Sequence, residues 1–118
     1  MADDVQSAAQ AQQVLGSIGA RALETNRNRV VQLTRLAAVG TRGRLSEVDR
    51  QRAVDIAHQL TGSAGTFGYP RVSSVARRLE LFFAEGDRDA TEHETALGWL
   101  AEIGRDLGRG PDEADELG

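Results

Sequence analysis

The residues best suited to chemistry lie in one short stretch, residues 55–68, which reads DIAHQLTGSAGTFG. Apolar residues recur there and just before it at helical spacing, and they are Ala53, Ile56, Leu60, Ala64 and Phe67. On a helical wheel of roughly 100° per residue, His58 falls about 160° from the centre of this apolar stripe. The pattern therefore predicts an imidazole that faces solvent or a partner, not the core.

Small residues surround this histidine on the predicted outer face, and they are Val54, Thr61, Gly62 and Gly65. A glycine costs roughly 1 kcal/mol relative to alanine inside a helix. Gly62 is one turn after His58, so its bare backbone leaves space over the ring. We interpret the pattern as a nucleophilic imidazole presented to another protein instead of a small-molecule pocket. Periodicity alone also allows an ordinary surface histidine.

Helical spacing recurs along the rest of the chain, and no strand-like alternation or hairpin signal is present. The first predicted helix runs from about Val5 to Val39, as one helix or as segments divided near Gly16 and Gly19. The second begins at a Ser46 cap, paired with Asp49 three residues on, and ends at about residue 67 or 68.

Two further helices are expected after the Tyr69-Pro70 break. One runs from about residue 71 to 84, with Phe82 and Phe83 in the core. The other begins at Thr91, which forms a capping box with Glu94, and it carries Leu97, Leu100, Ile103 and Leu107. The sequence thus predicts an all-α protein, an antiparallel up-down four-helix bundle with an additional N-terminal helical extension. We divide it into an extension (1–19), a bundle (20–107) and an acidic disordered tail (108–118).

Composition excludes several classes of function. The 118 residues contain no cysteine and two histidines, which argues against thiol chemistry and against a metal site. The net charge is −4, the arginines are scattered and aromatic residues make up 4%, so nucleic-acid binding is not expected. The opening residues do not form a signal peptide, and no apolar run is long enough for a membrane. We expect a soluble, cytoplasmic monomer.

Residues 57–80 resemble the histidine-containing phosphotransfer (HPt) domain family. The similar segments are AHQLTGSAGTFG at residues 57–68 and VSSVARRLE at residues 72–80, and the flanking helical pattern suits the family over about residues 20–107. The resemblance implies that His58 accepts a phosphoryl group and that Gly62 lets a receiver domain dock. Many family members carry a lysine three residues after the histidine, where this chain has Thr61.

The resemblance also implies partners and a division of labour. The implied partners, which would exchange phosphoryl groups with the module, are a response-regulator receiver domain and a histidine kinase. The receiver would bring Mg²⁺, while the chain itself would bind no cofactor or metal and have no autonomous kinase activity. We define the docking surface as the residues around His58, namely Val54, Gln59, Thr61, Gly62 and Gly65. The phosphoryl charge would meet only neutral donors from Gln59 and Thr61.

The remaining polar and aromatic residues receive plainer interpretations. His93, between two glutamates, is predicted to lie on the surface, and Trp99 at the edge of the core. Arg77 and Arg78 are predicted to lie on a solvated face, and Glu80 is predicted to bond across the bundle. Ser63 is predicted to have a structural role.

Two alternatives to phosphotransfer remain open at this point. One is a related bundle that only binds a receiver or a kinase without being phosphorylated. The other is a helical dimerisation or linker segment, for which the alanine- and glutamine-rich residues 7–13 are suited. A change in oligomer size on deleting the first fifteen residues would favour the second.

Overall fold

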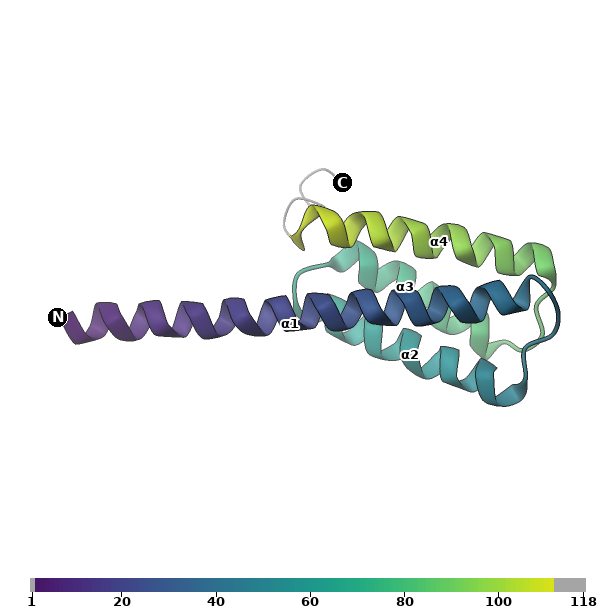
Figure 1. The fold of residues 1–118 in the computed structure, drawn as a ribbon, viewed down its shortest axis with the longest axis horizontal. Coiled ribbons are helices and arrows are strands. Elements are labelled where there is room, and N and C mark those ends of the chain that lie inside the picture. Colours follow the sequence, from purple (N-terminus) through teal and green to yellow (C-terminus); the bar gives the residue numbers. More distant parts are fainter. Residues whose placement is uncertain (1, 112–118) are drawn as a thin grey trace.

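The computed structural model describes residues 2–111, with side chains from residue 6 onward, and these residues form four helices in an up-down arrangement (Figure 1). The helices are α1 (Ala2–Gly40), α2 (Glu47–Thr66), α3 (Pro70–Ala84) and α4 (Ala90–Arg109). Each helix packs against two neighbours, so that α1 lies against α2 and α4, and α3 closes the bundle on the opposite side. The prediction of an all-α four-helix bundle is confirmed.

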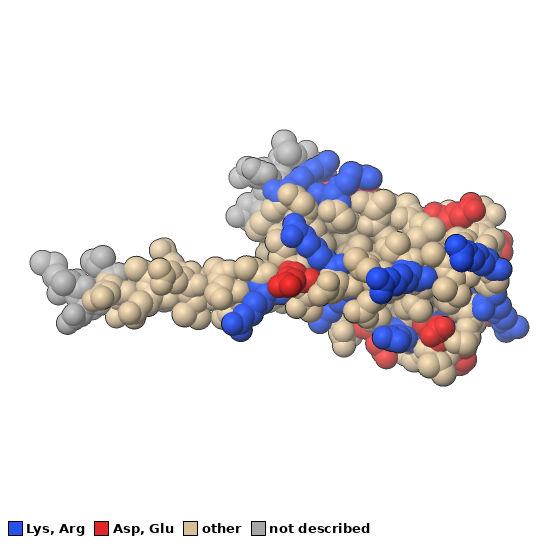
Figure 2. Space-filling model, in the orientation of Figure 1, with Lys and Arg blue, Asp and Glu red and all other residues tan. Residues whose placement is uncertain are grey.

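Helix α1 is continuous through Gly16 and Gly19, and its first half projects beyond the bundle (Figure 1). The projection carries exposed Val14, Leu15 and Ile18. Residues 6–20 of this projection contain no charged residue, and Figure 2 shows charged side chains where α1 meets the bundle. From Leu23 onward α1 packs against the core, and Leu33 and Ala37 are fully buried.

The core is built from the apolar stripes of the four helices. The largest fully buried side chains include Phe83, Leu33, Leu60, Leu79, Leu100, Ile103 and Leu107. In α2 the predicted stripe is buried except Phe67, which is partly buried at the helix end. Phe82 and Phe83 are buried, and Trp99 lies partly buried against the core, as predicted. This stripe fixes the rotation of α2 and hence the outward direction of its opposite face.

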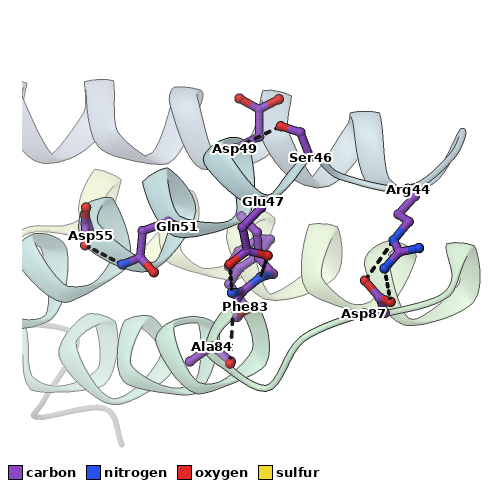
Figure 3. Close-up of polar contacts among 10 residues, drawn as sticks. Arg44, Ser46, Glu47, Asp49, Gln51, Asp55, Phe83, Ala84 and Asp87 are labelled. Carbon is purple, nitrogen blue, oxygen red and sulfur yellow. Dashed lines mark hydrogen bonds and ion pairs between the residues drawn. The ribbon is translucent and has the colours of Figure 1, made fainter.

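The ends of α2 follow from local chemistry. At its start, the Ser46 side chain accepts a hydrogen bond from the Asp49 backbone N–H, as the sequence predicts (Figure 3). At its end, Gly68 adopts a φ of 88°, a left-handed conformation that favours glycine. This turn lets the Tyr69 N–H donate to the Ala64 carbonyl at 2.8 Å.

The start of α4 differs from the prediction. The cap is Asp89, whose side chain accepts from the Glu92 backbone N–H at 2.8 Å, and the helix begins at Ala90 rather than at Thr91. Either residue can serve as a cap, and the one whose side chain lies beside the first free N–H groups does so. At the other end α4 continues through Arg109, past the expected boundary at residue 107. Of the predicted disordered tail, residues 112–118 lie outside the described part of the chain.

His93 corrects a second prediction, because it is buried and not a surface residue. Its ring packs edge-on against Phe82, with the ring centres 5.2 Å apart, and lies so close to Gly40 that a Cβ there would overlap it. His93 is three residues before Ala96 and seven before Leu100, which places it on the buried stripe of α4. The acidic neighbours concealed this spacing.

We expect the buried His93 to make the bundle sensitive to acid. Burial lowers the pKa of His93, since the charged ring loses its water there. In the unfolded chain this ring takes up a proton near pH 6.5. The free energy of unfolding is therefore unaffected by this group above that pH, and it decreases as the pH falls below it. Urea unfolding at pH 7.5 and pH 5.0 should show a larger loss of stability for the native chain than for His93→Phe. Equal losses in the two proteins would contradict this expectation.

Candidate functional site

His58 lies in the middle of α2 on the face opposite the buried stripe, where the wheel places it. Its side chain is 73% exposed, although Ala57, one residue before it, and Leu60, two residues after it, are fully buried. The imidazole is therefore held on a rigid helix but is open to a macromolecular partner. A side chain on a helix is positioned more precisely than one on a loop, which suits a reaction that depends on orientation.

Glu80, on α3, contacts the His58 ring. Both carboxylate oxygens of Glu80 lie 3.2 Å from His58 Nδ1, and the Glu80 side chain is 19% exposed. A carboxylate accepts hydrogen bonds, so it favours the tautomer in which Nδ1 carries the proton. The other nitrogen, Nε2, then keeps a free lone pair. Nε2 is therefore the ring nitrogen that this arrangement leaves able to act as a nucleophile.

Gly62 is exposed, and a Cβ built on it would meet nothing within 4 Å. The fold of the described residues therefore does not require glycine at this position. Gly65 differs, because a Cβ there would lie 3.3 Å from the hydroxyl oxygen of Ser73. The close approach of α3 therefore favours a residue without a side chain at position 65, although this position faces outward on α2. Of the two glycines, Gly62 is the one that packing within the described residues does not explain, which favours a role in contact with a partner.

The other docking-surface residues form the edges of the His58 face. Gln59 is exposed, while Val54 is partly buried against the core. The Thr61 hydroxyl donates to the Ala57 carbonyl at 2.8 Å, so its hydrogen is used within α2. The Thr61 carbonyl accepts from the Ser73 hydroxyl at 2.8 Å, which ties α2 to α3 beside the site.

Ser63 is structural, as predicted, but its partner comes from α1. The buried Asn26 side chain donates to the Ser63 hydroxyl at 3.1 Å, and Arg29 donates to the Asn26 carbonyl oxygen at 2.8 Å. A buried polar pair of this kind fixes how two helices align. Sequence reasoning missed Asn26, although it lies seven residues before Leu33 on the buried stripe of α1.

The described residues contain no group of three or more histidine, cysteine or carboxylate side chains that could hold a metal ion. The reactive groups at this position are the His58 imidazole and the Glu80 carboxylate, which contacts Nδ1. Such a pair suits nucleophilic attack by Nε2 on an electrophile that a partner carries.

The chain also matches a known protein family. A family model described as the Hpt domain matches residues 20–109. The chain belongs to the Hpt domain family. Neither a curated protein nor a solved structure matches it. The match begins inside α1 and ends with α4, so it covers the bundle and leaves most of the projecting half of α1 outside.

Membership in the Hpt family makes the chain a phosphotransfer module of signalling systems, a carrier of phosphoryl groups without a catalytic activity of its own. Such modules interact with receiver domains and kinases in phosphorelays. Within residues 2–111, no helix is both long and apolar enough to cross a membrane.

Proposed function

We propose that this Hpt domain is a cytoplasmic phosphorelay carrier in which His58 Nε2 accepts a phosphoryl group from an aspartyl phosphate of a receiver domain and passes it on to another aspartate. The observation that supports this most directly is the geometry of His58. Its side chain is 73% exposed, and its Nδ1 lies 3.2 Å from both oxygens of Glu80.

The proposed step needs no base. The lone pair of Nε2 attacks phosphorus, the P–O bond of the acyl phosphate breaks, and its electron pair leaves with the aspartate carboxylate. The imidazole keeps its proton on Nδ1 and gains positive charge, which the Glu80 carboxylate stabilises across 3.2 Å. Onward transfer is the reverse of this step with a second aspartate. Atoms and charge balance in both directions.

The receiver would supply what the carrier lacks. In this proposal Mg²⁺ is bound by the receiver, beside its aspartate, and the chain binds no cofactor. The docking surface of Val54, Gln59, Thr61, Gly62 and Gly65 would lie against the receiver, with the bare Gly62 backbone giving the closest approach. The module would act as a monomer, because its His58 face has to be free.

The experiment that tests the proposal follows transfer of labelled phosphoryl from a phosphorylated receiver and Mg²⁺ to the purified chain. For the role of Glu80 we expect Glu80→Ala to slow this transfer roughly tenfold, by removing the acceptor that holds Nδ1–H. Glu80→Gln should retain part of the rate, since its amide oxygen can still accept the hydrogen bond from Nδ1–H.

Glu102→Ala, which removes an exposed carboxylate from α4, is the matched control for charge. Rescue by Glu80→Gln separates positioning from charge, because both variants lose the carboxylate charge and only Glu80→Ala also loses the acceptor for Nδ1–H. An unchanged rate in Glu80→Ala would show that Glu80 has no part in the transfer.

The projecting half of α1 favours a second candidate function, that of a helical dimerisation module. Its exposed Val14, Leu15 and Ile18 are covered by none of the described residues. Light scattering on the full chain and on a chain lacking residues 1–15 separates the two candidates. A dimer that dissociates on this deletion, together with no uptake of phosphoryl groups, would favour dimerisation.

A further inference from the structure

Phosphorylation of His58 would place a strong negative charge on a face of α2 whose neighbouring polar side chains, Gln59 and Thr61, are uncharged. A phosphoryl group carries between one and two negative charges near pH 7. Phosphoryl transfer proceeds mainly by positioning and by neutralising charge on the transferring oxygens. The Thr61 hydroxyl donates to the Ala57 carbonyl, and the nearest charged group, Glu80, is negative. The site as described therefore lacks a cation on α2.

The contacts between α2 and α3 show which residues of α3 lie opposite the site. Ser73 bonds to the Thr61 carbonyl at 2.8 Å, and Glu80 lies 3.2 Å from His58 Nδ1. The two helices run antiparallel, so the residues of α3 between Ser73 and Glu80 lie opposite α2 between Thr61 and His58 (Figure 1). Arg77 is four residues after Ser73 and three before Glu80, which places it on this same edge of α3.

Arg77 is also available for a ligand. It is exposed, and no hydrogen bond or ion pair engages its guanidinium within the described part of the chain. A guanidinium matches the geometry of phosphate oxygens with two parallel N–H donors, and its charge persists at every physiological pH. The arginine side chain is long and flexible, so its guanidinium can extend from α3 toward the exposed His58 ring.

The other arginines near this edge have different partners. Arg78 lies over the Trp99 ring, with its guanidinium carbon 5.4 Å from the ring centre, on the side of α3 that faces α4. Arg50 lies two turns before His58 and donates to the Glu47 carboxylate and to the Phe83 carbonyl. Between Ser73 and Glu80, the two contacts that align α3 with the site, Arg77 is therefore the arginine whose guanidinium has no partner among the described residues.

We propose that Arg77 is the phosphoryl-binding cation of this module: it pairs with the phosphoryl oxygens on His58 Nε2 and occupies the role that no side chain of α2 fills. This inference rests on the proposed function of His58. It replaces the interpretation of Arg77 as part of a merely solvated face. It also explains how Thr61 can stand beside the acceptor histidine without loss of the carrier's chemistry.

Phosphoramidate is the probe that tests this assignment, because it brings no protein cation with it. Nε2 attacks phosphorus, the P–N bond breaks, and the protonated amine leaves as ammonia with the bonding electron pair. We expect Arg77→Ala to take up phosphoryl roughly tenfold more slowly than the native chain, and Arg77→Lys to fall between the two. Arg78→Ala, an equal loss of charge one residue away, should match the native rate.

A second readout distinguishes charge pairing from a change in structure. Phosphorus NMR of the phosphorylated chain follows the titration of the phosphoryl group itself. Its midpoint should move to higher pH in Arg77→Ala, since a nearby cation favours the dianion, and should not move in Arg78→Ala. If the native chain and Arg77→Ala share the same rate and the same midpoint, the inference about Arg77 is wrong while the function of His58 stands. A native chain that takes up no phosphoryl group from phosphoramidate or from a receiver would overturn both.

Discussion

Replacing His58 with glutamine is expected to abolish phosphoryl acceptance while leaving the fold intact. The side chain is 73% exposed and lies outside the core, so its loss removes no buried packing. Glutamine is a good helix former, and its amide has no lone pair of comparable nucleophilicity. Acceptance from a phosphorylated receiver should fall below detection, which is a larger effect than that of any neighbouring substitution. Scintillation counting of the purified chain after gel separation measures it.

His93→Phe is the matched control for the loss of a histidine, since it removes the other imidazole of the chain. We expect this variant to accept phosphoryl groups at the native rate at pH 7.5, because His93 is buried between α1, α3 and α4 and cannot meet a receiver. Phosphoryl uptake that persists in His58→Gln and is lost in His93→Phe would show that His93, and not His58, is the acceptor.

Gly62→Gln is expected to produce opposite effects on folding and on transfer. A Cβ at this position meets nothing within 4 Å, so the fold tolerates the new side chain. Because glycine costs a helix interior roughly 0.5–1 kcal/mol, the substitution should raise the free energy of unfolding by a similar amount. The same side chain, one turn from His58, should obstruct a docked receiver and slow transfer by roughly 10- to 100-fold, as expected for 1–3 kcal/mol of steric conflict.

Helix α4 provides a control for this pair of effects. Gly98 is exposed, lies within a helix and also has nothing within 4 Å of a built Cβ. Gly98→Gln should therefore stabilise the bundle to a similar degree without slowing transfer. Urea unfolding and transfer rates on the two variants decide the matter. If Gly62→Gln transfers as fast as Gly98→Gln, the receiver does not approach over Gly62.

The predictable features of the fold are those that depend on spacing along one helix. The outward position of His58 follows from the stripe of Ala53, Ile56 and Leu60, all of which are buried. The Ser46 cap follows from residue type and from Asp49 three residues later. In both cases the determining contacts lie within a few residues, so the local sequence contains the information.

The features that were missed depend on more than local composition. His93 and Asn26 are polar residues that occupy apolar stripes, and their helical spacing indicated burial although their residue types did not. Asp89 and Thr91 are both good caps, and the phase of α4 decides between them.

The contact between Glu80 and His58 joins residues 22 positions apart. It depends on how α3 aligns with α2, which no periodicity within one helix reveals. The same is true of Gly65, whose bareness is partly explained by Ser73 on the neighbouring helix. The alignment of α2 and α3 is thus the part of the site that required the structure, and it is also what brings Arg77 into the argument.

The central claim is that His58 carries the phosphoryl group on Nε2, and one measurement tests it directly. The purified chain is incubated with a phosphorylated receiver and Mg²⁺, and the product is examined by phosphorus NMR with correlation to the ring protons. We predict a single acid-labile phosphohistidine signal that couples to the ring as an Nε2 adduct and is absent from His58→Gln. A receiver that binds the chain and leaves it unphosphorylated, or a phosphoryl group found on Nδ1 or on another residue, would contradict the account.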